Sequence, residues 1–158
     1  MDATFRLAIS YSAHLLGTIL WIGWSFLLVV ASTTQDDVFV NRLRRWMPWA
    51  LLGFAVLGGS GFYQMVVDAH YEDLLAITNA WSRAMLVKHL LYGLELVLLV
   101  WLELVFFPEF GLQQRIRDAG RFAPHYETML RRLRLVAWVN GLLAVSVLVA
   151  TAYMTALP

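Results

Sequence analysis

Four long apolar stretches, separated by polar segments, dominate the pattern of hydrophobic and polar positions along the chain. They cover about residues 7–31, 47–67, 84–107 and 135–157. Each holds at least about 20 residues, the length that an α-helix needs to cross about 30 Å of hydrocarbon. None shows the regular polar positions of an amphipathic soluble helix. The pattern predicts an all-α integral membrane protein, with residues 1–158 forming a single domain, a bundle of four transmembrane helices.

Composition supports the same class of protein. Hydrophobic residues make up 60% of the chain and charged residues 15%, against about 45–50% and about 25% in soluble domains. The first stretch is too long for a signal peptide and lacks a small-residue cleavage site, so we expect it to remain in the mature protein.

The net charge of +1 does not favour nucleic acid as a partner. The absence of cysteine excludes disulfides, iron–sulfur clusters, thiolate metal sites and covalently attached c-type haem.

The positive charges are distributed unevenly between the loops. The first and third loops carry nine arginines: Arg42, Arg44, Arg45, Arg115, Arg117, Arg121, Arg131, Arg132 and Arg134. The opposite side carries only Arg6, Arg83 and Lys88. The positive-inside rule places the Arg-rich loops in the cytoplasm and both termini outside, in the inner (cytoplasmic) membrane of the cell.

The third loop is more than a simple linker. We expect Pro108 and Gly111 to end the third membrane helix. Part of the following segment, about residues 112–131, combines arginines with Leu, Ile and Phe. This mixture predicts a short cytoplasmic helix lying at the membrane interface.

The two halves of the chain are faintly alike. The first apolar stretch contains "HLLGTILWIGW" and the third contains "HLLYGLELVLLVW". Each of these two stretches is followed by a loop that carries arginines. A tandem repeat of helical hairpins, related by an axis along the membrane normal, would explain this similarity. The match is short and rich in leucine, so chance similarity is the alternative.

Two histidines lie at matching depths in the apolar stretches. His14 is seven residues into the first stretch and His89 five residues into the third, or roughly 7–11 Å below the outer edge. The two helices run in the same direction, so both imidazoles share one layer. Ionisable groups inside a membrane are costly and often functional. Ligation of haem b by both imidazoles would satisfy them; the alternative is that the histidines only pack.

Other residues fit a haem pocket. Trp21, Trp24, Tyr92 and Trp101 suit its walls, and Arg6, Arg83 and Lys88 lie at the membrane edge where haem propionates need cations. The second stretch carries a run of small residues: Gly53, Gly58, Gly59, Ser60 and Gly61. Small residues allow close approach of a neighbouring helix, the more frequent case, or of a flat cofactor.

Lys88 and His89 are adjacent, so their side chains diverge by about 100° around the helix. We expect one of them to face the cavity and the other to point away. A lysine near a helix end reaches water at little cost, which favours His89 as the second axial ligand. Glu95 lies seven residues past Lys88 and nearly beneath it, where it would suit a proton route or a quinone-binding wall.

The remaining candidates are weaker. Tyr11 and Ser12 are further candidates for a quinone site near the outer interface. His70 is more typical of a solvated loop, although it would suit a proton route or a second haem. Glu103 is placed to reach an arginine, and His125 lies in the Arg-rich loop, where we expect it at the surface.

Three segments resemble the CopD-like family of small membrane proteins, which is similar to the HemJ-type protoporphyrinogen IX oxidases. They are "AHLLGTILWIGWSFLLVV", "RLRRWMPWALLGFAVLGGSG" and "WSRAMLVKHLLYGLEL", and the resemblance spans about residues 10–105. It implies a four-helix architecture with haem b, in which His14 and Lys88 correspond to the residues tied to haem and activity. The arginine usual after the Trp–Gly motif is missing here, and His89 is an additional residue.

The sequence leaves four functions to compare. The leading one is a haem-b membrane protein that passes electrons between a quinone pool and a partner protein, as an anchor subunit of a redox complex or as a homo-oligomer. The second is a HemJ-type oxidase in haem biosynthesis. The third is a CopD-like protein of copper transport or resistance, with weak support because Met and His are not clustered. The fourth is an assembly subunit without a cofactor.

Overall fold

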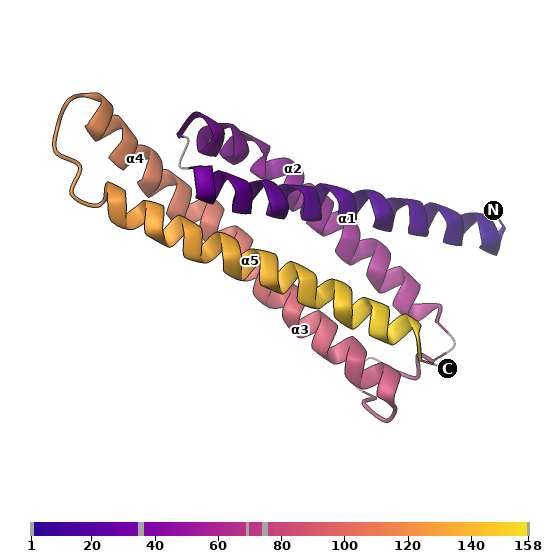
Figure 1. The fold of residues 1–158 in the computed structure, drawn as a ribbon. Helices are drawn as coiled ribbons and strands as arrows, with labels where there is room; N and C mark the ends of the chain where they lie inside the picture. Colours follow the sequence, from indigo (N-terminus) through magenta and orange to yellow (C-terminus); the bar gives the residue numbers. More distant parts are fainter. Residues whose placement is uncertain (1, 35–36, 69, 74–75, 158) are drawn as a thin grey trace.

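The structure, a computed structural model, describes residues 2–34, 37–68, 70–73 and 76–157. In chain order the elements are α1 (Ala3–Thr34), α2 (Asp37–Val66), α3 (Ala80–Trp101), the π-helical turn η1 (Leu102–Phe106), α4 (Phe107–Asp118) and α5 (Tyr126–Thr155) (Figure 1). The residues within these ranges contain no β-strand. Four helical segments of this described part are long and apolar enough to cross a membrane: α1, α2, the continuous α3–η1–α4 rod, and α5. The prediction of an all-helical, multi-pass membrane protein is confirmed at this level.

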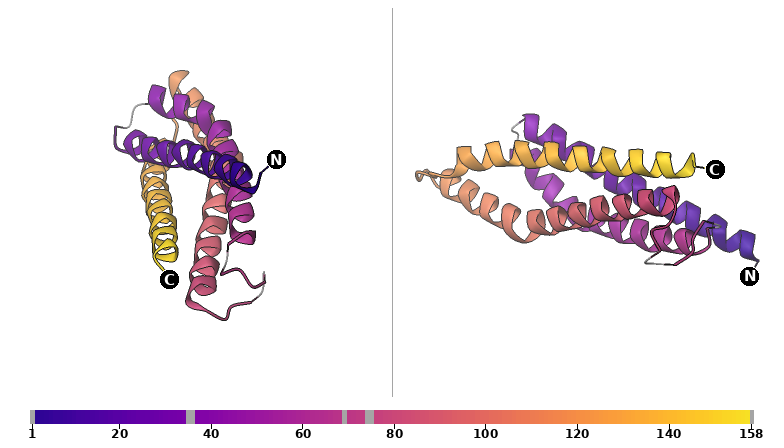
Figure 2. Two further views of the ribbon diagram at one scale, coloured as in Figure 1. Left: turned by 90° about the vertical axis from the view of Figure 1, so that its right-hand side faces the viewer. Right: turned by 90° about the horizontal axis from the view of Figure 1, so that it is seen from below.

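The helices form two antiparallel hairpins that pack against each other. The first hairpin is α1 with α2, the second is the α3–α4 rod with α5, and α1 contacts α5 between them. Both termini and the α2–α3 connection lie at one end of the bundle (Figures 1 and 2). We call this the termini end. The opposite end, where α1 meets α2 and α4 meets α5, carries the nine loop arginines and is called the Arg-rich end.

The helices extend beyond the predicted apolar stretches. Helix α2 begins at Asp37, ten residues before the predicted 47, and α5 begins at Tyr126 instead of 135. Helices α1 and α3 also begin earlier, at Ala3 and Ala80, than the predicted 7 and 84. Hydropathy marks only the part of a helix that lies in hydrocarbon, whereas backbone hydrogen bonding continues into the polar flanks.

Pro108 and Gly111 do not end the third helix, contrary to the sequence-based expectation. The rod continues through both residues to Asp118. The π-helical turn η1 immediately precedes Pro108, and the altered hydrogen bonding of a π turn accommodates a residue that lacks an N–H group. The rod bends in this region (Figure 2), as helices commonly do at such turns.

The expected interfacial segment 112–131 is divided in the structure. Residues 112–118 continue α4, residues 119–125 form the turn, and residues 126–131 begin α5. Gly120 has a φ of 70°, the left-handed conformation that glycine adopts without strain just after a helix ends. The arginines of this segment therefore extend from the ends of two long helices.

The core is continuous from the middle of the bundle to the Arg-rich end. Helices α1 and α2 approach most closely at Gly17 and Gly53: a Cβ added to Gly17 would lie 2.6 Å from the carbonyl oxygen of Gly53. Gly53 therefore serves close helix packing, one of the two interpretations of the small-residue run. Nearer the Arg-rich end, Phe106, Phe110 and Tyr126 stack in a row with centroids 5.8–5.9 Å apart.

The outer surface of the bundle is largely apolar. Many large hydrophobic side chains are exposed along all four rods, among them Leu16, Phe26, Val97, Leu104 and Leu142. In water such a surface would aggregate, whereas in lipid it is the expected exterior. Trp46 and Trp49 are exposed near the start of α2, the position where tryptophan anchors helices at a membrane interface.

Candidate functional site

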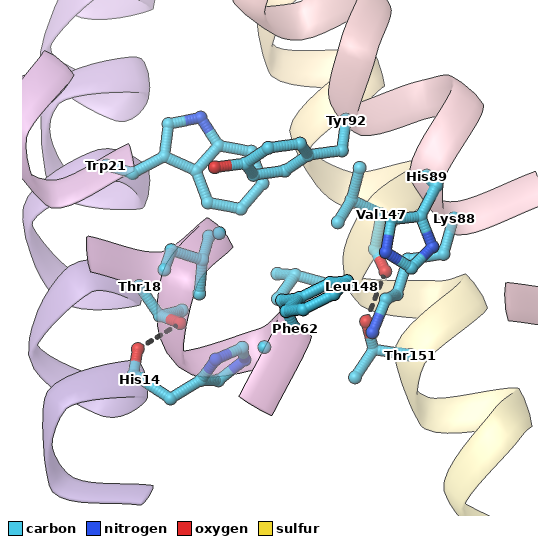
Figure 3. A pocket seen from close by; sticks show the side chains of 13 residues that line it. His14, Thr18, Trp21, Phe62, Lys88, His89, Tyr92, Val147, Leu148 and Thr151 are labelled. Carbon is cyan, nitrogen blue, oxygen red and sulfur yellow. Dashed lines mark hydrogen bonds between the residues drawn. The ribbon is translucent and has the colours of Figure 1, made fainter. Parts of the chain in front are cut away.

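A cavity of about 280 Å³ opens between the helices toward the termini end. All four rods line it (Figure 3). The lining residues are His14, Thr18 and Trp21 of α1; Leu57, Gly58, Gly61 and Phe62 of α2; Lys88, His89 and Tyr92 of α3; and Val147, Leu148 and Thr151 of α5. Most of this lining is apolar, and a few polar groups converge on it. That combination is typical of small-molecule and cofactor sites.

His14 projects into the cavity from α1 and is half-buried. Its Nδ1 lies 3.1 Å from the hydroxyl oxygen of Ser60. The Ser60 hydroxyl donates its own hydrogen to the carbonyl of Val56 at 2.7 Å, so its oxygen accepts from His14. This assigns the proton to Nδ1 and leaves Nε2 with a lone pair. Gly61 leaves room for the ring, because an added Cβ would lie 3.2 Å from the Cε1 atom of His14.

His89 borders the same cavity from α3, on the side opposite His14 (Figure 3). Its Nδ1 lies 2.8 Å from the carbonyl oxygen of Met85. A carbonyl only accepts hydrogen bonds, so Nδ1 carries the proton and Nε2 has a lone pair. His89 also borders a second cavity beneath the α2–α3 connection, which it shares with Phe62.

The two imidazoles therefore have the same chemical form. In each, Nδ1 lies within hydrogen-bond distance of a neighbouring oxygen. This is how proteins commonly prepare histidine as a metal ligand, because the Nδ1 partner fixes both tautomer and ring orientation. Two neutral imidazoles at one cavity are a donor set that would suit haem b. Phe62, His89 and Leu148 are exposed, so a group larger than the enclosed volume can project between them into lipid.

Lys88 also borders this cavity, although the sequence led us to expect only one of Lys88 and His89 to do so. Its side chain is half-buried and, among the residues described, makes no hydrogen bond or ion pair. Adjacent residues diverge by about 100°, but a wide cavity accommodates both directions. The site therefore contains two imidazoles and one amine.

An aromatic group closes the cavity toward the centre of the bundle. The rings of Phe54 and Tyr92 stack at a centroid distance of 3.9 Å and an interplanar angle of 9°, and Trp21 meets Phe54 edge-on at 5.7 Å. The Tyr92 hydroxyl donates to the carbonyl of Phe54. Gly58 leaves space for this hydroxyl, because an added Cβ would lie 2.6 Å from it. We call Trp21, Phe54 and Tyr92 the aromatic floor.

Several predicted site residues lie elsewhere. Arg6 borders a shallow depression between α1 and α2, and Arg83 a groove between α3 and α5, so neither reaches the cavity of His14. Tyr11 is exposed. His70 is exposed, lies 2.9 Å from Asp68 and stacks near Trp81.

Glu95 and Glu103 lie deeper in the bundle. The Glu95 side chain is fully buried, and its Oε1 accepts a hydrogen bond of 3.2 Å from the indole Nε1 of Trp21. Neither Glu95 with Lys88 nor Glu103 with an arginine forms an ion pair in the described part of the chain. The predicted alignment of Lys88 and Glu95 therefore produces no direct contact, and Lys88 faces the cavity instead.

Sequence reasoning missed the contribution of α5. Val147, Leu148 and Thr151 form one wall of the cavity. A weak signal was present, since Asn140 and Thr151 are polar residues eleven positions apart in an apolar helix. Eleven residues make about three helical turns, so both lie on one face.

No three His, Cys, Asp or Glu side chains of the described residues gather in a way that could hold a metal ion. Compared with models of known protein families, with curated proteins and with solved structures, the chain matches none.

Proposed function

We propose that the chain is a haem-b membrane protein that passes electrons between a quinone pool and a partner protein. One observation carries this proposal: His14 and His89, 75 positions apart in the sequence, border one intramembrane cavity, each with Nδ1 held by a neighbouring oxygen. Two such imidazoles on different helices are the usual axial ligands of a b-type haem.

Each lining residue has a part in this proposal. His14 and His89 would hold the iron, and the aromatic floor with the wall of α5 would surround the apolar macrocycle. Bound there, haem b would supply a reversible one-electron couple. Lys88 places a positive charge at the cavity, which stabilises the more negatively charged, reduced state of an occupant.

The apolar exterior supports the remaining parts of the proposal. Quinone is a lipid-soluble carrier and would approach from the membrane, where Phe62, His89 and Leu148 leave the cavity partly open. The described residues form no domain outside the helical bundle. We therefore propose that electrons leave to a partner subunit, with this chain as an anchor subunit or a homo-oligomer in the inner membrane.

The orientation rests on the arginine distribution. All nine loop arginines lie at the Arg-rich end, and the positive-inside rule places this end in the cytoplasm with both termini outside. The two hairpins match the proposed tandem repeat in outline, and each contributes a histidine to the cavity from its first helix. A cytoplasm-dependent reporter fused to either terminus should be inactive, and an active one would reverse the orientation.

A second candidate is supported by Lys88. This amine borders the same cavity as His14, as the His/Lys arrangement of the HemJ-type protoporphyrinogen IX oxidases would require. In that case His14 and Lys88 hold the haem, and the chain oxidises a porphyrinogen with quinone as acceptor. Copper handling, the CopD-like alternative, is a third candidate.

Haem content of purified variants tests the proposal. We expect a pyridine haemochrome spectrum of a b-type haem from the wild type, and loss of most haem from His14→Ala and His89→Ala. His125→Ala is the matched control, because His125 is exposed near the Arg-rich end, and it should keep full haem. A wild type reconstituted with haem that shows no b-type spectrum would rule out the proposal. Full haem in His89→Ala with loss in Lys88→Ala would favour the second candidate.

A further inference from the structure

A buried carboxyl group lies directly beneath the aromatic floor. Glu95 is 0% exposed, and although its Oε1 accepts from Trp21, its Oε2 has no hydrogen-bond partner within the described residues. It also makes no ion pair among those residues. A buried polar atom left unpaired costs about 1–3 kcal/mol, so this atom calls for an explanation.

Two further buried polar side chains share this situation. Ser25 on α1 is 2% exposed and Asn140 on α5 is 0% exposed. The Ser25 hydroxyl and both amide atoms of Asn140 lack partners among the residues described. Three different helices therefore each direct an unpaired polar group into the core.

Helical register places the three groups in neighbouring layers. Ser25 lies one turn beyond Trp21, and Glu95 lies just under one turn beyond Tyr92, both toward the Arg-rich end. On α5, Asn140 lies about two turns from Val147 in the same direction. Helices α1 and α5 touch at this depth, because a Cβ added to Gly141 would lie 3.4 Å from Val29.

Buried water is the general solution for such a set of groups. An internal water makes two to four hydrogen bonds to polar groups that would otherwise be unsatisfied. The Oε2 of Glu95, the hydroxyl of Ser25 and the two amide atoms of Asn140 each have an open hydrogen-bonding position for such a water. They offer both donors and acceptors, as a water in the core requires.

Unpaired polar atoms continue toward the Arg-rich end. Glu103 Oε2 and Gln113 Oε1 are buried without partners in the described part of the chain. Glu103 lies within the π-helical turn η1, and π turns occur frequently at functional sites. Buried unpaired groups therefore occur at three levels of the third rod, at Glu95, Glu103 and Gln113, about 12 Å and about 15 Å apart along its axis.

We propose that Ser25, Glu95 and Asn140 bind water inside the bundle, and that Glu95 exchanges protons with the Arg-rich end through this water and Glu103. The coupling to redox chemistry rests on the proposed function: for each electron that a quinol donates to an occupant of the cavity, releasing one of its own hydroxyl protons at the termini end, the Glu95 carboxylate would gain one proton. That proton would be relayed by the water from the Arg-rich end and returned by the same route when the occupant is reoxidised. The remaining titratable groups around the cavity are His14 on α1, and Lys88, His89 and Tyr92 on α3; α2 and α5 contribute none to its lining.

Infrared spectroscopy tests the water without requiring haem. At acid pH, the carboxyl C=O band of Glu95 is identified as the band lost in Glu95→Gln. We expect this band to shift promptly when the wild-type protein is transferred to D₂O, although the side chain is fully buried. Asn140→Leu fills the water site and should slow the shift at least about tenfold, because exchange then requires opening of the core. Ser25→Ala, a smaller change, should slow it in the same direction.

Three infrared results would overturn the proposal. They are the absence of a Glu95 band, a wild-type band that does not exchange, and equal exchange rates in the wild type, Asn140→Leu and Ser25→Ala.

A redox titration tests the coupling in the haem-loaded protein. A tenfold change in proton activity corresponds to about 59 mV for a one-electron couple, so the midpoint potential should fall by up to that amount per pH unit. Glu95→Gln should flatten this dependence. Glu109→Gln is the matched control, because Glu109 is exposed on α4, and it should keep the wild-type slope. An unchanged slope in Glu95→Gln overturns the coupling. A protein that takes up no haem would rule out the proposed function. The infrared experiment would still show whether Ser25, Glu95 and Asn140 bind water.

Discussion

The two ends of the bundle differ in how the helices meet. At the Arg-rich end, Asp37 at the start of α2 pairs with Arg117 of α4 and accepts a hydrogen bond from Tyr126 of α5. The Arg117 guanidinium also lies 4.2 Å from the centre of the Tyr126 ring. At the termini end no polar cluster of this kind is found among the described residues. A small apolar cluster of Met65, Trp81 and Met85, with Met154 of α5 packed against it, is buried there instead, and the cavity of His14 and His89 opens between the helices.

The contrast separates stability from chemistry. Polar contacts join three helices at the Arg-rich end, whereas apolar packing joins α2, α3 and α5 at the termini end. An open, apolar space with a few oriented polar groups can then form within the membrane. We expect changes at the Arg-rich end to alter the free energy of unfolding, and changes at the cavity to alter ligand binding and redox properties.

Gly17→Ala should have the largest effect on stability. The added Cβ would lie 2.6 Å from the Gly53 carbonyl oxygen and 2.9 Å from the Leu57 backbone nitrogen, and backbone atoms cannot move aside easily. We expect a loss of about 3 kcal/mol in the free energy of unfolding, measured by denaturant titration in detergent. Gly23→Ala on the same helix is the control, because nothing lies within 4 Å of its added Cβ. Equal stability of the two variants would contradict the close crossing of α1 and α2.

Asp37→Ala tests the Arg-rich end alone. It removes a charged hydrogen-bond partner from both Arg117 and Tyr126, and we expect it to lower the free energy of unfolding by about 2 kcal/mol. Haem content per folded protein should stay unchanged, since the cavity lies at the other end. Asp118→Ala is the matched control: Asp118 also lies near Arg117, at 3.4 Å, but is exposed, and its loss should cost under about 1 kcal/mol. A loss of haem in Asp37→Ala would show that the two ends are not independent.

Lys88→Met should have the smallest effect, and only at the cavity. The change keeps an unbranched side chain, shorter by one atom, and removes its charge. A positive charge about 10 Å away stabilises a reduced occupant by about 1–2 kcal/mol at an effective dielectric constant of about 20. The midpoint potential should therefore fall by roughly 60 mV, with haem content near normal. A potentiometric titration that shows an unchanged or raised potential would exclude this role of Lys88.

The number and class of the elements could be predicted from sequence, because the bilayer imposes a fixed apolar length on each span. Helix ends could not, since hydrogen bonding in α2 and α5 continues through polar residues that hydropathy excludes. The equal depth of His14 and His89 could be counted along the chain, and the structure places both at one cavity.

The residues that surround the two histidines could not be predicted by counting positions along the chain. The wall formed by Val147 and Thr151 depends on how α5 packs between α1 and α3, and a leucine-rich sequence contains little information about such packing. The positions of Arg6 and Arg83 outside the cavity likewise depend on helix rotation, which the depth of a residue does not determine.

The central claim is that His14 and His89 together hold a haem b. Near-infrared magnetic circular dichroism of the oxidised protein tests it most directly, because the low-spin ferric charge-transfer band depends on the pair of axial ligands. The account predicts the band of bis-imidazole ligation in the wild type, and its loss in His89→Ala. A wild-type band of imidazole–amine ligation, removed by Lys88→Met and retained in His89→Ala, would contradict it.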